Sequence, residues 1–96
     1  MVIITASWKA KPGKEKELQK HLEEMVKQVR ENEPDCLEYL LHQNNSDKSS
    51  FFFYEQYTSL NALDDHKESL HFKNLMNNTK ELVANDVKVD FFNLVI

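Results

Sequence analysis

Residues 50–57 read Ser50-Phe51-Phe52-Phe53-Tyr54-Glu55-Gln56-Tyr57, and five of these eight residues are aromatic. Aromatic residues favour strands, and successive side chains of a strand point to opposite faces of a sheet. Phe53 and Tyr57 therefore share one face. Phe52 and Tyr54 share the other. The stretch predicts a strand with bulky apolar groups on both faces and one carboxylate among them.

On either side of this strand, the spacing of the apolar residues indicates further elements. Some segments have the two-residue period of a strand and others have a helical period. The predicted strands occupy 2–10, 36–43, 51–57 and 87–96. The predicted helices occupy 14–32 and 60–83, the second with a kink near Ser69. The order β-α-β-β-α-β is the ferredoxin-like split pattern. We therefore expect one α+β domain over residues 1–96, with a four-stranded antiparallel sheet.

The two helices of such a fold cover only one face of the sheet. Phe52 and Tyr54 are then left on the uncovered face, and the last predicted strand is also apolar on both sides. A large exposed apolar patch is unusual on a monomer. The pattern predicts a homodimer packed sheet to sheet.

The composition excludes several classes of function. Twelve basic residues against sixteen acidic ones give a net charge of −4, which argues against general nucleic-acid binding. Nothing reaches the roughly 18 apolar residues that a membrane span needs. The single cysteine, Cys36, excludes an internal disulfide and a cysteine-rich zinc site. We expect a soluble protein of the reducing cytoplasm that binds neither nucleic acid nor membrane.

Motifs for common cofactors are also missing. The chain has one glycine, so it has no Gly-rich phosphate loop and no dinucleotide fingerprint. No Cys/His cluster marks a metal or haem site. If the protein is an enzyme, we expect it to work without a tightly bound conventional cofactor or metal.

His66 lies on a helical stripe of leucines and should point toward the sheet. The stripe consists of Leu60, Leu63 and Leu70. One interpretation is a core histidine that is hydrogen-bonded to the backbone or to a carboxylate. The other is a general base or hydrogen-bond donor in a pocket between helix and sheet.

Glu55 also has two possible roles, one structural and one catalytic. Its neighbours two residues away on the strand are aromatic, and a lone buried carboxylate is costly, so Glu55 should be paired or hydrogen-bonded. It either holds His66 in one tautomer or takes part in catalysis directly.

The remaining candidates have weaker patterns. His21 lies on the apolar stripe of the first helix and is either a core residue or part of the pocket lining. Trp8 and Tyr39 share faces with core residues and are either core or the wall of a flat aromatic pocket. His71 lies five residues from His66, which places the two well apart around a helix and makes no metal pair.

Four segments together resemble the antibiotic biosynthesis monooxygenase family. They are Glu33-Pro34-Asp35-Cys36-Leu37-Glu38-Tyr39, Phe53-Tyr54-Glu55-Gln56-Tyr57, Ser59-Leu60-Asn61-Ala62-Leu63-Asp64-Asp65-His66 and His71-Phe72. They follow one another in the family's order and spacing across nearly the whole chain. The Glu-Pro-x-Cys-x-x-Tyr element and the Glu-x-aromatic…His…His-Phe element are specific in combination.

The resemblance implies a dimeric α+β barrel of ferredoxin-like subunits, with a pocket between sheet and helices. Members of the family include cofactor-free oxygenases of polycyclic aromatics and quinols, isomerases of small signalling sugars, and haem-degrading enzymes. The positions that carry over by motif are Glu55, Tyr57 and His66, with Tyr39 and Phe72 as pocket lining.

The chain departs from the family pattern at several positions. Asp35 stands where glycine is usual, and Tyr57 where tryptophan is common. In the haem-degrading branch, a tryptophan occupies the place of His66 and a histidine falls near Met76. The resemblance therefore disfavours haem degradation.

The main functional hypothesis is a cofactor-independent monooxygenase that acts on a quinol or phenolic aromatic. Two alternatives are an isomerase of a small carbonyl signalling compound and a non-catalytic ligand-binding dimer. The predicted catalytic residues are His66 and Glu55. The predicted pocket residues are Tyr57, Tyr39, Trp8, Phe53, His21 and Phe72.

Overall fold

The computed structural model describes residues 1–96 and has the predicted order of elements, with the second helical stretch broken in two. The strands are β1 (Val2–Lys9), β2 (Cys36–Gln43), β3 (Ser50–Tyr57) and β4 (Lys88–Phe92). The helices are α1 (Glu15–Asn32), α2 (Leu60–Glu68) and α3 (Leu70–Thr79). The predicted α+β, ferredoxin-like fold is confirmed.

The four strands form one antiparallel sheet in the order β2-β3-β1-β4. The aromatic strand β3 is therefore internal, between β1 and β2. Its register places Glu55 opposite Ile4 on one side and Tyr39 on the other. This position delivers a carboxylate to an internal strand, where the side chain is almost fully buried.

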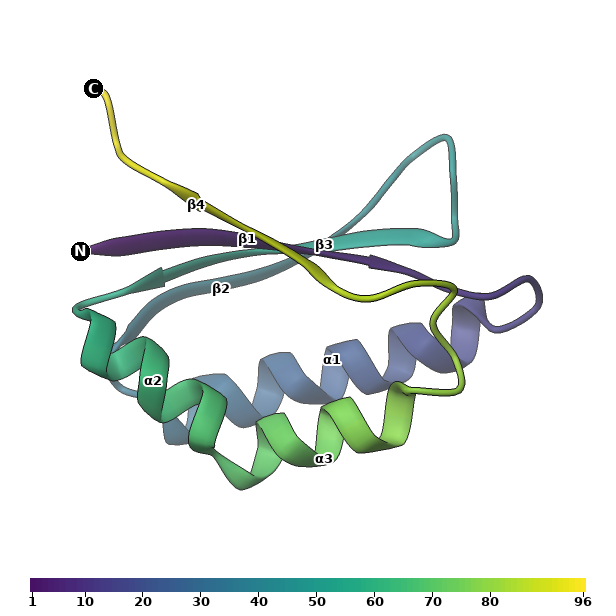
Figure 1. Cartoon of the computed structure of the whole chain (residues 1–96), viewed down its shortest axis with the longest axis horizontal. Helices are drawn as coiled ribbons and strands as arrows, with labels where there is room; N and C mark the ends of the chain where they lie inside the picture. The colour runs from purple at the N-terminus through teal and green to yellow at the C-terminus, as the bar shows by residue number, and fades with distance from the viewer.

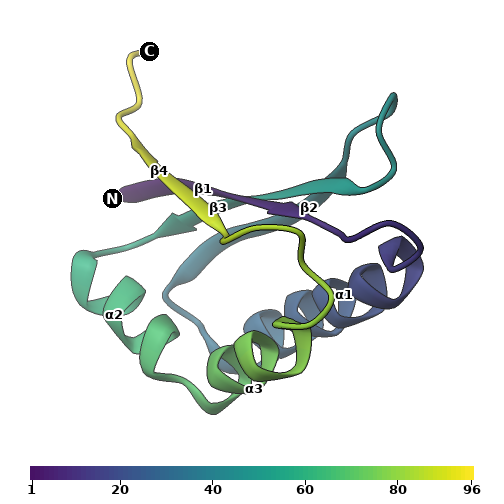
Figure 2. The same cartoon turned by 45° about the vertical axis from the view of Figure 1, so that its right-hand side comes forward.

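The helices all lie on one face of the sheet, and the other face is open (Figures 1 and 2). Apolar residues of α1 pack against the covered face and are almost fully buried. They are Leu18, Leu22, Met25 and Val29. On the open face Phe52 keeps 38% and Phe92 52% of its surface exposed. No helix has the length and apolar character that a transmembrane segment requires.

Three predicted details of the strands and helices are wrong. The last strand ends at Phe92 rather than at Ile96, and the helix expected to reach Val83 ends at Thr79. The two-residue period of the strand predicted over 36–43 places Leu37, Tyr39 and Leu41 on one face, yet Leu37 is 52% exposed whereas Tyr39 is buried. A register irregularity between Cys36 and Glu38 explains this, because an extra residue in a strand reverses the alternation.

The stripe expected around His66 is also only half correct. Leu63 and His66 are buried, but Leu60 is 61% and Leu70 74% exposed. Leu60 is the first residue of α2, whereas Leu70 lies beyond Ser69. The extended backbone of Ser69 ends α2, and its side-chain Oγ caps the start of α3 by accepting a hydrogen bond from the Phe72 N–H (3.1 Å). The kink predicted near Ser69 is thus a complete break, and residues after it do not continue the face of α2.

Candidate active site

A cavity of about 360 Å³ lies between the covered face of the sheet and the helices α2 and α3. Twelve of its fifteen lining residues are hydrophobic, and the three others are Glu55, His66 and Lys67. The lining includes six of the eight predicted site residues: Trp8, Tyr39, Phe53, Glu55, His66 and Phe72. Val89 and Phe91 of β4 line it as well, although both are about half exposed. The cavity therefore has an apolar wall and a small polar end.

Glu55 forms one part of the polar end. Its side chain is 3% exposed, and its Oε1 accepts a hydrogen bond of 2.6 Å from the Tyr57 hydroxyl. Burial raises the pKa of Glu55 above its ordinary value, and the Tyr57 hydrogen bond opposes that rise only in part. Tyr57 itself is fully buried and does not line the cavity, so its predicted pocket role becomes one of holding Glu55.

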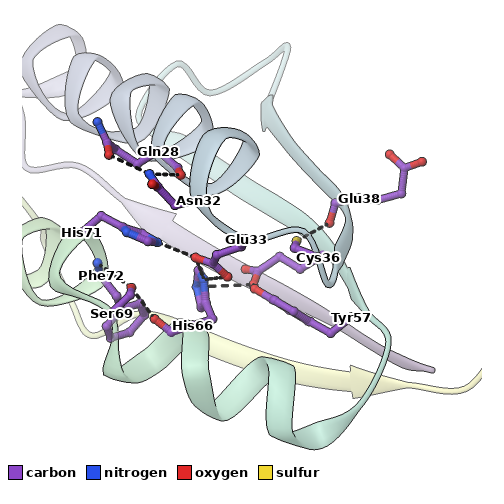
Figure 3. A network of polar contacts seen from close by, with 11 residues as sticks. Gln28, Asn32, Glu33, Cys36, Glu38, Tyr57, His66, Ser69, His71 and Phe72 are labelled. Atoms are coloured by element: carbon purple, nitrogen blue, oxygen red, sulfur yellow. Dashed lines mark hydrogen bonds and ion pairs between the residues drawn. The ribbon is translucent and has the colours of Figure 1, made fainter.

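His66 forms the other part, and its two ring nitrogens face different carboxylates. Nδ1 lies 3.0 and 2.9 Å from the two carboxylate oxygens of Glu33, and Nε2 lies 3.9 Å from Oε1 of Glu55. The rings of Tyr39, Tyr57 and Phe72 surround the imidazole, with centroids 5.2 to 5.5 Å away. Figure 3 shows His66 between the loop that carries Glu33 and strand β3.

Glu33 is a site residue that the sequence reasoning missed. It follows the last residue of α1 and precedes Pro34, and that pattern indicates a helix end rather than a functional residue. Burial acts to raise the pKa of Glu33, but hydrogen bonds from His66 and His71 outweigh this effect and the net pKa is lowered. An ionised carboxylate can only accept hydrogen bonds, so the neutral His66 ring carries its proton on Nδ1 and leaves Nε2 bare.

His71 was predicted to lie far from His66, and this is wrong. The ring centroids are 6.4 Å apart, and His71 Nε2 makes a short hydrogen bond to Oε2 of Glu33. The prediction assumed one continuous helix across both residues. The break at Ser69 turns the chain so that the two imidazoles converge on one carboxylate. The ligand atoms of Glu33, His66 and His71 all lie within 4.8 Å of one another.

His21 is misplaced by the prediction as well. It does not line the apolar cavity but a separate surface groove between α1 and α3, together with Glu24, Gln28 and His71. Its position on the helical stripe is correct, but it lies at the edge of that stripe and is only partly buried. The groove reaches the rim of the cluster formed by Glu33, His66 and His71, hereafter the Glu33 cluster.

The raised pKa of Glu55 gives a prediction for stability. A buried carboxyl with a raised pKa binds more protons in the folded state than in the unfolded one, so stability falls as pH rises from its ordinary value of 4.5 through the folded pKa. Glu55→Gln keeps the acceptor for Tyr57 and removes this cost. We expect the variant to gain stability over wild type as pH rises above about 4.5, measured by urea unfolding at several pH values.

Glu31→Gln on the exposed side of α1 is the matched control, since the same change there removes no buried charge. A stability difference between Glu55→Gln and wild type that stays constant from pH 4 to pH 8 would contradict the assignment.

Known proteins of the same fold share this chain's architecture. The PA3566 protein of Pseudomonas aeruginosa has a TM-score of 0.92 at 30% identity, over 99% of this chain and 94% of that one. An antibiotic biosynthesis monooxygenase structure gives 0.92 at 28% identity, with both chains fully covered. The Rv0793 protein of Mycobacterium tuberculosis gives 0.90 at 26% identity, over 99% of this chain and 95% of that one.

The sequence comparisons are consistent with these structures. An uncharacterised protein of Synechocystis is 23% identical over 93 residues, and the match spans 97% of this chain but only 63% of that relative's length. The family model described as antibiotic biosynthesis monooxygenase matches residues 1–78, which include β1 to β3, the Glu33 cluster and Glu55. The chain therefore belongs to the antibiotic biosynthesis monooxygenase family.

Proposed function

We propose that the protein is a cofactor-independent monooxygenase of a quinol or phenolic aromatic, with His66 as the general base. One observation carries the proposal: His66 lines the polar end of a largely apolar cavity, and the Glu33 carboxylate holds its Nδ1. With the proton of the neutral ring assigned to Nδ1, Nε2 is left to accept one. An ionised Glu33 stabilises the imidazolium that forms when Nε2 takes a proton. The arrangement provides a base of fixed tautomer beside an aromatic-walled cavity.

The proposed reaction needs no outside reductant. His66 Nε2 takes the hydroxyl proton of the substrate, and the resulting aromatic oxyanion is rich enough in electrons to reduce O₂ directly. One oxygen atom becomes bonded to the ring carbon, and the O–O bond then breaks. The second oxygen leaves as water with the proton returned by His66 and the hydrogen lost from the ring carbon. A phenol plus O₂ thus gives a quinone plus water, with all four electrons supplied by the substrate.

The cavity wall favours an aromatic substrate over the small carbonyl compound of the isomerase hypothesis. Phe53 and Tyr39 stack with centroids 4.6 Å apart, and Trp8 meets Phe53 edge to face at 6.5 Å. A flat ring can continue this packing and bury its own apolar surface. A small, highly hydroxylated compound would leave its polar groups unpaired against the same wall.

Oxygen uptake tests the proposal. A panel of naphthols, hydroquinones and anthrones is incubated with the protein in air and under anaerobic conditions, and product and dissolved O₂ are followed together. We expect turnover only in air, with one O₂ consumed per quinone formed. Equal rates without O₂ would contradict the monooxygenase, and no turnover of any compound would support a non-catalytic binding protein.

We also propose that two copies of the chain pair through the open face of the sheet. Support comes from the apolar side chains that this face exposes, among them Leu40, Phe52 and Phe92. Phe52 also stacks on His42 of the neighbouring strand with centroids 4.4 Å apart, which adds a second ring to the patch. A twofold pairing would bury the patch on both chains at once.

Phe52→Lys tests the pairing because it places a charge among the apolar side chains of that face. We expect light scattering after size exclusion to give the mass of a dimer for wild type and of a monomer for the variant. Leu60→Lys is the control, since Leu60 is exposed on the opposite, helical layer. A monomeric wild type, or a Phe52→Lys variant that remains dimeric, would rule the interface out.

A further inference from the structure

The Glu33 cluster contains more ligand chemistry than a general base requires. Orienting His66 takes one carboxylate, yet a second imidazole, that of His71, also points at Glu33. Figure 3 shows the three side chains converging from the end of α1, from α2 and from the start of α3. Two imidazoles and one carboxylate form a donor set that Zn²⁺ and similar divalent ions use in proteins.

The donor atoms of the cluster are close enough together to approach one ion. Zn–N and Zn–O bonds of roughly 2.0–2.2 Å at tetrahedral angles separate the ligand atoms by about 3.3 Å. His66 Nδ1 lies 2.9 Å from Oε2 of Glu33, and all three donor atoms lie within 4.8 Å of one another. Binding an ion therefore requires the three side chains to shift from their hydrogen-bonded positions.

An ion has a route to these atoms from the surface. The side chains of Glu33 and His71 are 12% and 14% exposed, whereas that of His66 is only 4% exposed. A surface pocket of about 170 Å³ opens on Glu33 and His71 and is also lined by Asp35 and Asp65. These carboxylates attract cations, and the pocket leaves room for water at a fourth coordination position.

A partner already lies on the far side of His66. Histidines that bind metals usually donate their other ring N–H to a carboxylate or carbonyl. Nε2 of His66 lies 3.9 Å from Oε1 of Glu55, which is the side chain needed for that contact. The Tyr57 hydroxyl holds Glu55 in turn.

We propose that Glu33, His66 and His71 form a binding site for a borderline divalent cation such as Zn²⁺, and that the bound ion switches off the base. The ion coordinates Nδ1 of His66 and Nε2 of His71. Because a coordinated nitrogen cannot also carry a proton, the proton of each neutral ring moves to the other ring nitrogen by exchange with water. Nε2 of His66 then carries a proton toward the cavity and cannot accept one from a substrate. The binding site stands by itself, and only the inhibition rests on the proposed function.

Binding is tested on the purified full chain with Zn²⁺ and with Co²⁺ as a spectroscopic probe. We expect one ion per chain by calorimetry, a melting temperature that rises with Zn²⁺ concentration, and visible Co²⁺ absorption of four-coordinate intensity. His71→Ala and Glu33→Gln should each weaken binding by more than the roughly 10–100-fold that loss of an outer partner costs. His21→Ala in the neighbouring groove and Cys36→Ser in the surface pocket should bind as wild type does.

Nuclear magnetic resonance of ¹⁵N-labelled histidine tests the switch without any substrate. The His66 ring should change from the Nδ1–H to the Nε2–H tautomer when Zn²⁺ is added, and should not change in His71→Ala. No binding by wild type, binding unaffected by His71→Ala, or binding lost in Cys36→Ser would overturn the site. If the tautomer changes but Zn²⁺ does not inhibit quinol turnover, the site stands and the role of His66 as base fails.

Discussion

His66→Ala should lower the rate of quinol oxidation on the order of 10²–10⁴-fold, because that is the usual contribution of a positioned general base. The change removes the bare Nε2 at the polar end of the cavity, while the aromatic wall that holds the substrate stays. Substrate affinity should therefore change much less than kcat. Oxygen uptake at saturating quinol gives kcat, and quenching of Trp8 fluorescence, from the single tryptophan of the chain, gives affinity.

The control for this variant separates lost chemistry from lost structure. His66 is 3% exposed and bonded to Glu33, so its removal is expected to cost about 1.5–3 kcal/mol of folding free energy as well. Added imidazole can enter the space that the side chain vacates and should restore part of the rate in His66→Ala. His21→Ala, which changes an imidazole outside the cavity, should leave kcat as in wild type. A His66→Ala protein that folds and turns over at the wild-type rate would remove His66 from the mechanism.

The fold could be predicted because its signals are local and repeated. The alternation in β3 and the helical stripe of α1 each involve many residues, so one exception changes little. Leu37 was assigned to the wrong face because a single register irregularity reverses a two-residue period and leaves no mark in the composition. Residues 94–96 are apolar but form no strand, since hydrophobicity alone does not supply a hydrogen-bonding neighbour.

The site residues that could be predicted are those whose position follows from the residue pattern of a single strand or helix. Glu55 follows from the alternation of β3, and His66 from its spacing to Leu63 on α2. Glu33 and His71 depend on tertiary structure: one lies at a helix end and the other beyond a helix break. The Glu33-Pro34 and His71-Phe72 dipeptides belong to the segments that resemble the family. That resemblance is the only feature of the sequence that could have indicated a functional role for Glu33 and His71.

Glu33→Gln should reduce turnover about as strongly as loss of His66, although the side chain has almost the same shape. The glutamine amide can present an N–H group to His66 Nδ1, and the ring then places its proton on Nε2, toward the cavity. The base is lost through the wrong tautomer and through loss of the charge that stabilises the imidazolium. Replacing the orienting carboxylate of a serine protease triad by an amide lowers kcat by about 10⁴ in this way. We expect a loss of roughly 10²–10⁴-fold here, measured as quinol-dependent oxygen uptake.

The same variant should also change how stability depends on pH. Glu33 has a lowered pKa when folded, so its contribution to stability is complete above its ordinary value of 4.5 and is lost as pH falls through the lower, folded pKa. Glu33→Gln should therefore be less stable than wild type near neutral pH, and the difference should shrink as pH falls below about 4.5. Glu31→Gln two residues earlier should show no such convergence. Full activity in Glu33→Gln would mean that His66 needs no orienting anion, because the buried ring would then keep its working tautomer without one.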